Sequence, residues 1–152
     1  MMMRNSAVLA CRLALGGIFL YASLDKIAHP DQFAAAVANY RLLPGILVNL
    51  FAIFLPWAEF ICGLLLVAGL FSSGSLAVIL GMLCVFIVAV GINMARGLDI
   101  SCGCFDTVEG RVIGVRLLLE DLGMVAIGIM IMLFDDGSWS LSRLLRRRTK
   151  TA

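Results

Sequence analysis

The chain alternates long apolar stretches with short polar breaks, and four of the stretches are long enough to cross a membrane. No charged residue occurs between Phe60 and Ala95. This stretch is too long for one helix across a hydrocarbon layer of about 30 Å and fits a hairpin of two helices. We therefore predict an all-α fold, a bundle of four transmembrane helices. The predicted spans cover approximately residues 6–27, 46–70, 75–95 and 115–134.

Two shorter amphipathic segments accompany the spans. After the first span, a proline breaks the helix, and Phe33, Val37 and Tyr40 then recur at the spacing of one helical face. This pattern predicts a short interfacial helix over approximately residues 30–41. In the C-terminal residues 135–152, apolar side chains alternate with arginines. We expect this basic amphipathic tail to bind anionic lipid headgroups.

Small residues predict where the helices approach one another closely. In the first span they are Ala10, Ala14, Gly16 and Gly17. In the third span, Ala77 and Gly81 form a small-xxx-small face. We expect a neighbouring helix to pack on each of these faces.

Composition and charge agree with a membrane protein and predict its orientation. Hydrophobic residues make up 62% of the 152 residues and charged residues 14%, whereas a soluble domain has about 25% charged residues. The length predicts a single domain, 1–152. With four spans, both termini lie on one side, which collects most of the lysine and arginine residues. We therefore expect a bacterial cytoplasmic (inner) membrane protein with both termini in the cytoplasm.

The polar stretch between the third and fourth spans carries the candidate chemistry, which is the pair Cys102 and Cys104. Alternate residues of an extended strand lie about 6.6 Å apart, near the upper limit for a disulfide, and Gly103 permits the turn that brings the two cysteines closer. A strained or exposed disulfide exchanges readily with partner thiols. We interpret the pair as redox-active, on the periplasmic side, where disulfides persist. A static staple or two idle thiols are the alternatives.

Several short motifs, taken together, match a known family. They are Arg12, Asp25-Lys26, Tyr40 with Leu43-Pro44, Leu55-Pro56-Trp57-Ala58-Glu59 and Cys102-Gly103-Cys104-Phe105. With these motifs the chain resembles the MauE family of methylamine utilisation proteins, within the DoxX-like group of four-helix membrane proteins. One position departs from the family pattern, because Asp106 replaces the glycine that commonly follows the phenylalanine. Its negative charge disfavours a thiolate.

The resemblance implies a maturation factor in methylamine metabolism that acts through thiol–disulfide exchange. Its expected partners are a periplasmic thioredoxin-like protein and a substrate protein with disulfides, such as the small subunit of methylamine dehydrogenase. Membrane lipid surrounds it, and no nucleic acid is expected to bind. The catalytic residues on this interpretation are Cys102 and Cys104, supported by Gly103 and Phe105.

Two acids within the spans are further candidates. Glu59 is expected near the bilayer midplane, where an ionised carboxylate is costly unless it is paired or protonated. Arg12 offers a partner from the first helix, and the two roles left open are locking of the bundle and proton transfer or quinone contact. Asp121 is expected either to line a cavity beneath the cysteine stretch or to bond to Lys26 or a neighbouring backbone group.

Other side chains of the spans have a structural and a functional interpretation. Trp57 either stacks on a quinone, the candidate cofactor, or simply packs. Cys62 and Cys84 are expected at similar depth, as a candidate thiol relay or as small buried hydrophobic residues. Arg116 and Glu120 are four residues apart, and we expect them to form an ion pair.

Two other functions remain open from the sequence. A soft-metal transporter for copper or mercury would use Cys102 and Cys104 as the external metal site, with Cys62, Cys84 and Cys11 as inner stations. A noncatalytic assembly subunit would dock a periplasmic enzyme at the membrane through the interfacial helix.

Overall fold

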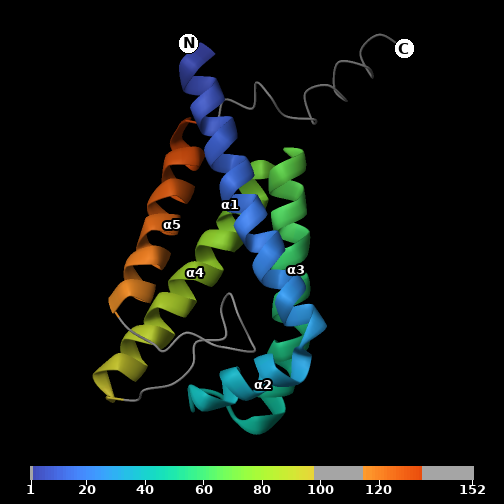
Figure 1. The fold of residues 1–152 in the computed structure, drawn as a ribbon, viewed down its shortest axis with the longest axis vertical. Helices are drawn as coiled ribbons and strands as arrows, with labels where there is room; N and C mark the ends of the chain where they lie inside the picture. The colour runs from blue at the N-terminus through green and yellow to red at the C-terminus, as the bar shows by residue number, and fades with distance from the viewer. Residues whose placement is uncertain (1, 98–114, 135–152) are drawn as a thin grey trace.

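The computed structural model describes residues 2–97 and 115–134, which form helices joined by short turns (Figure 1). The prediction of an all-α fold with four long apolar helices is confirmed, and each of the four is long and apolar enough to cross a membrane. No strand occurs within these two ranges. The four long helices are α1 (Met2–Ala28), α3 (Gly45–Ala68), α4 (Ser72–Ala95) and α5 (Val115–Phe134). The short helix α2 (Pro30–Asn39) follows α1 directly. The predicted cysteine pair and basic tail lie outside the described residues.

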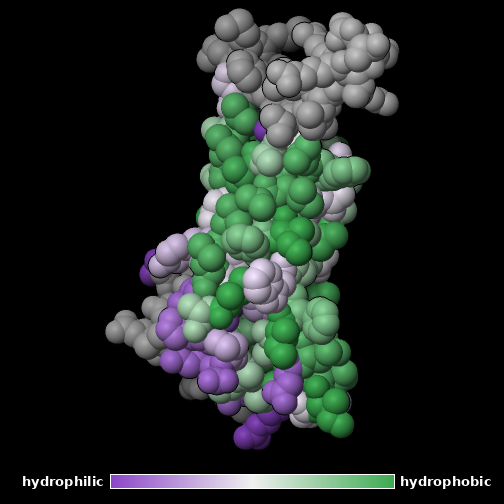
Figure 2. Space-filling model, turned by 90° about the vertical axis from the view of Figure 1, so that its right-hand side faces the viewer, coloured by the Kyte–Doolittle hydropathy of each residue, from purple (hydrophilic) through white to green (hydrophobic). Residues whose placement is uncertain are grey.

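The helices form a bundle that is closed at one end and splayed at the other. The turn between α3 and α4 lies at the end where α1 begins, and the two helices diverge towards the opposite end, where α2 lies (Figure 1). α1 packs against α3 and α5, and α5 packs against α4. Figure 2 shows apolar side chains along the length of the bundle and polar ones gathered near α2. This distribution is that of a multi-pass membrane protein.

α1 and α3 approach closely at two glycines. A Cβ atom on Gly16 would lie 2.6 Å from Val67 Cγ2 and 3.1 Å from the carbonyl oxygen of Gly63. A Cβ atom on Gly63 would lie 3.2 Å from the carbonyl oxygen of Gly16. The predicted close approach in the first span is therefore confirmed at Gly16, whereas a Cβ atom on Gly17 would meet nothing within 4 Å.

Replacing Gly16 by leucine is expected to lower the free energy of unfolding by about 1–3 kcal/mol, because the added side chain forces α1 away from α3. Gly17→Leu adds the same side chain to the next residue of the same helix, in open space. We expect this control to change stability by less than about 0.5 kcal/mol. Unfolding in mixed detergent micelles measures the stability of both variants. Equal losses of stability would show that the close contact of α1 with α3 at Gly16 does not stabilise the bundle.

The predicted packing face on the third span is wrong. Ala77 is exposed, and a Cβ atom on Gly81 would meet nothing within 4 Å. The physical reason is that α4 buries another face, which includes Leu76, Ile79 and Leu83. α4 instead has a close contact with α5, where a Cβ atom on Gly128 would lie 2.7 Å from Leu80 Cδ2.

The turn between α3 and α4 is closed by two backbone hydrogen bonds. The N–H of Gly69 donates to the carbonyl of Leu66 at 3.2 Å, and the N–H of Leu70 donates to the carbonyl of Leu65 at 2.9 Å. This pair of bonds is a Schellman motif, with Gly69 in the left-handed region at φ 69°. Phe71 also has a positive φ of 50°. The chain therefore reverses at once, and α4 begins at Ser72, earlier than the sequence pattern predicts.

Candidate functional site

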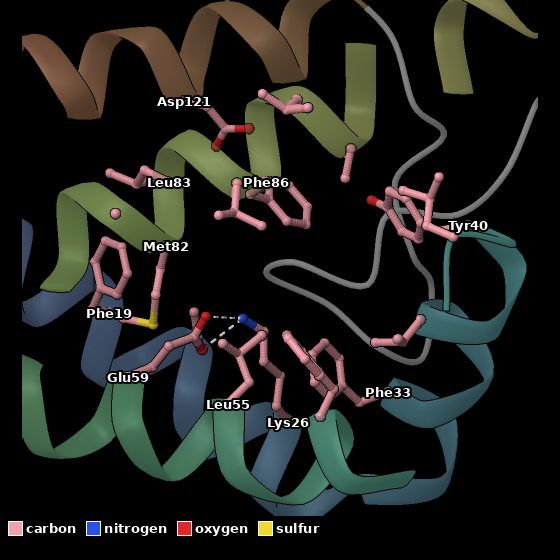
Figure 3. Close-up of a pocket in the computed structure, with 18 of the residues that line it drawn as sticks. Phe19, Lys26, Phe33, Tyr40, Leu55, Glu59, Met82, Leu83, Phe86 and Asp121 are labelled. Atoms are coloured by element: carbon pink, nitrogen blue, oxygen red, sulfur yellow. Dashed lines mark hydrogen bonds and ion pairs between the residues drawn. The ribbon is translucent and has the colours of Figure 1, made fainter. Parts of the chain in front are cut away.

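A cavity of about 650 Å³ lies in the splayed half of the bundle, lined by side chains from all five helices (Figure 3). Its volume is in the range of about 300–1,000 Å³ that is typical of small-molecule sites. The lining is almost entirely apolar, with phenylalanines from several helices. The polar exceptions are Lys26, Glu59, Asp121 and Tyr40. An apolar cavity with a few polar groups is the usual form of a binding site.

Lys26 of α1 and Glu59 of α3 form an ion pair in the cavity wall. Lys26 Nζ lies 2.9 Å from Glu59 Oε1 and 2.7 Å from Oε2. The side chains are only 7% and 9% exposed. The ammonium also lies 5.3 Å from the centroid of the Phe33 ring of α2. Both charges are therefore shielded from water, and the pair joins α1 to α3.

The prediction that Arg12 pairs with Glu59 is wrong. Arg12 and Lys26 are fourteen residues apart on α1, about 21 Å along the helix axis, so one carboxylate cannot reach both. Arg12 is buried elsewhere on the helix. Lys26, whose position in the sequence indicates the membrane interface, is buried as well, because α2 folds back and places Phe33 over it.

Asp121 extends from α5 into the same cavity. Figure 3 shows its carboxyl group on the wall opposite the Lys26–Glu59 pair. The residue is 2% exposed, and its Oδ2 atom has no hydrogen-bond partner within the described part of the chain. A buried carboxyl oxygen without a partner is costly unless something else supplies the missing bond. This atom is therefore the clearest point of attachment for a ligand.

Tyr40 completes the polar groups at the α2 end of the cavity. Its ring packs against Phe86 of α4, with centroids 6.0 Å apart and planes tilted by 57°. Burial raises the pKa of Tyr40 above its ordinary value, and the nearby negative charge of Asp121 raises the pKa further. The phenol is therefore protonated at physiological pH, and it adds no negative charge to the cavity.

Other predicted site residues lie away from the cavity. Trp57 is 52% exposed on α3, with its ring edge-on to Phe60 at 6.3 Å. It does not line the cavity. Cys62 is half-buried and Cys84 is exposed, both as free thiols, so a relay between them stays a prediction. Cys11 is the third free thiol of the described residues.

The predicted pair of Arg116 and Glu120 is confirmed, with Nε and Oε1 3.1 Å apart on the exposed side of α5. Within residues 2–97 and 115–134, no group of three or more His, Cys, Asp or Glu side chains is placed to hold a metal ion. The proposed inner metal stations therefore form no cluster in this part of the chain.

Cys102, Gly103, Cys104 and Phe105 lie outside the described residues, but the chain on either side is placed. α4 ends and α5 begins at the end of the bundle where α2 lies, opposite the start of α1 (Figure 1). This is also the end of the bundle that contains the cavity.

Sequence similarity indicates one family. The family model described as "Methylamine utilisation protein MauE" matches residues 4–134. The chain is 31% identical over 123 residues to "Methylamine utilization protein MauE" of Paracoccus denitrificans, which covers 80% of this chain and 66% of the relative. It is 38% identical over 84 residues to the protein of the same name from Methylophilus methylotrophus, covering 55% of this chain and 44% of the relative. The chain thus spans about half to two thirds of these curated relatives. No solved structure matches it.

Proposed function

This chain belongs to the MauE family of methylamine utilisation proteins, and on that premise we propose that it is a membrane maturation factor acting by thiol–disulfide exchange. The observation that carries the proposal is the Cys102-Gly103-Cys104 sequence in the polar stretch between two spans of a family member. Its partner is a periplasmic thioredoxin-like protein, which passes the disulfide on to a substrate protein of methylamine utilisation. We also propose that the family lies within the wider DoxX-like group of four-helix membrane proteins.

The exchange begins when a partner thiolate attacks one sulfur of the Cys102–Cys104 disulfide, forming a mixed disulfide and releasing the other cysteine as a thiolate. The second partner thiolate then attacks the mixed disulfide. The partner leaves with a disulfide, and Cys102 and Cys104 are both reduced. Two electrons and two protons pass from the partner to this protein, and the reverse sequence returns them.

The orientation proposed for this chemistry is consistent with the arrangement of the helices. α1 begins at the end of the bundle opposite the one where α4 ends (Figure 1). With the N-terminus and the basic tail in the cytoplasm of a bacterium, Cys102 and Cys104 belong to the periplasmic side of the inner membrane. Disulfides form and persist in that compartment.

Replacing both Cys102 and Cys104 by serine is expected to abolish oxidation of the thioredoxin-like partner, because the exchange needs both sulfurs. Thiol alkylation followed by a mass-shift assay measures the partner's redox state in cells. The matched control is the pair Cys62→Ser and Cys84→Ser, which also removes two thiols and should leave the partner oxidised. An unchanged partner in the Cys102/Cys104 variant would exclude thiol exchange, and full maturation of the substrate enzyme would favour a noncatalytic assembly subunit.

A further inference from the structure

We propose that the cavity among the five helices is a binding site for the headgroup of a quinone dissolved in the membrane. The proposal rests on the mouth of the cavity, its two polar walls and its charge. It goes beyond thiol exchange, and no cysteine is among the described residues that line the cavity.

The mouth of the cavity opens on the apolar outer surface of the bundle. Several lining residues are also exposed, among them Val85 and Val88 of α4 at 66% and 59%, and Phe51 of α3 at 41%. These side chains belong to helices that are long and apolar enough to cross a membrane. In a bilayer the mouth would therefore face hydrocarbon. A ligand that enters here is lipid-soluble and has an apolar body or tail.

The two polar sites of the cavity lie on opposite walls. An ammonium group has three N–H donors, and Lys26 directs two hydrogen bonds to Glu59, which leaves a donor that no described residue uses. Across the cavity, Oδ2 of Asp121 is an acceptor without a partner in the described chain. A ligand that satisfies both sites accepts a hydrogen bond on one side and donates one on the opposite side.

The charge of the cavity disfavours an anionic ligand. Lys26 and Glu59 neutralise each other, and the phenol of Tyr40 is protonated. The remaining ionisable group in the lining is the carboxyl group of Asp121. Lys26 is the one cation in the described lining and is already paired with Glu59, so a fatty acid carboxylate or a lipid phosphate would find no unpaired cation there. The headgroup is therefore neutral.

The reduced form of a quinone meets these three conditions together. Its ring carries two oxygens on opposite sides, and its tail stays in the hydrocarbon. In the oxidised form a carbonyl accepts a hydrogen bond from Lys26, and in the reduced form a hydroxyl donates one to Asp121. Phe19, Phe33 and Phe86 line the space between the two walls, and aromatic side chains suit a flat ring.

The test uses the full chain in quinone-free lipid nanodiscs, titrated with decylubiquinone or its reduced form, with bound ligand quantified after separation. Gly81→Phe fills the cavity, since Gly81 lines it and a Cβ atom there meets nothing within 4 Å. We expect it to weaken binding at least about tenfold. Gly91→Phe adds the same side chain to the same helix, in open space and outside the lining, and should bind as the unsubstituted protein does.

A second variant tests the ligand chemistry. Asp121→Leu keeps the branched shape of the side chain and removes the acceptor, so it should weaken binding of the reduced form by about tenfold. Binding of the oxidised form should fall less. Equal binding by the Gly81→Phe and Gly91→Phe variants would overturn the site. Displacement of decylubiquinone by an equal concentration of oleic acid would overturn the assignment of a quinone as the ligand and indicate a general lipid pocket.

The outcome is separable from that of thiol exchange. The variant with both Cys102 and Cys104 replaced by serine should bind decylubiquinone unchanged, because it leaves every described group of the cavity lining in place. If the unsubstituted protein binds the quinone but does not oxidise its partner, thiol exchange is excluded and the quinone site stands. If it oxidises its partner but does not bind the quinone, the quinone site is excluded and thiol exchange stands.

Discussion

Replacing Glu59 by glutamine is expected to lower the free energy of unfolding by about 3–5 kcal/mol. The substitution leaves the ammonium of Lys26 buried without the carboxylate that accepts two of its hydrogen bonds. Because the surroundings are apolar side chains and lipid, no water replaces the lost counter-ion at low cost. The loss therefore reflects the desolvated charge that remains, more than the strength of the original pair.

Unfolding in mixed micelles measures this loss of stability. Two further variants show whether the loss comes from the unpaired buried charge. Lys26→Met combined with Glu59→Leu removes both charges and should recover most of the stability, because apolar side chains of similar size replace the pair. Glu120→Gln breaks the exposed pair with Arg116 and should cost less than about 1 kcal/mol. If Glu59→Gln costs no more than Glu120→Gln, the buried pair does not hold α1 to α3.

Replacing Leu66 by alanine is expected to lower the free energy of unfolding by about 2–3 kcal/mol, towards the lower end of core substitutions in soluble proteins. Leu66 is fully buried in the packed half of the bundle, beside Leu76 and Ile131. In a membrane, lipid tails are as apolar as leucine, so removing the side chain changes the solvation free energy little. What is lost is the packing against neighbouring helices.

The control for this experiment lies two residues away on the same helix. Leu64 is 50% exposed, and its outer surface meets lipid. Leu64→Ala should therefore change stability by less than about 0.5 kcal/mol. The same unfolding measurement compares the two variants. Similar losses at Leu64 and Leu66 would show that contact with lipid stabilises the bundle as much as contact between helices does.

The four spans were predictable because each is set by local properties of the chain. A helix in lipid must satisfy its own backbone hydrogen bonds, so a long uncharged stretch leaves little choice of structure. The break at the proline after His29 is local as well, and α2 follows it as predicted. The predicted spans therefore needed no knowledge of which helix packs against which.

The candidate site was less predictable, because it depends on how the helices are rotated and shifted against one another. The sequence indicated Glu59 and Asp121 as acids within spans, but the partner of Glu59 depends on depth along α1. Lys26 lies near the end of an apolar stretch, and only the folding back of α2 buries it. The polar walls of the cavity are thus a tertiary feature.

The exposed position of Trp57 had a signal in the sequence. Trp57 is two residues from Glu59, and residues two apart on a helix do not share a face. Trp57 therefore faces lipid when Glu59 faces Lys26. Gly81 is a different case, because a small residue suits a close helix contact and an open cavity equally well. The pattern alone does not distinguish the two.

The Schellman turn between α3 and α4 bears on how the protein is made. Its residues carry no charge, and the reversal at Gly69 leaves no room for a loop outside the membrane. Neither helix has a flanking basic residue at this turn to orient it during insertion. We therefore expect the two helices to leave the translocation machinery as one hairpin, with the positive charges of Arg41 and Arg96 at its open ends.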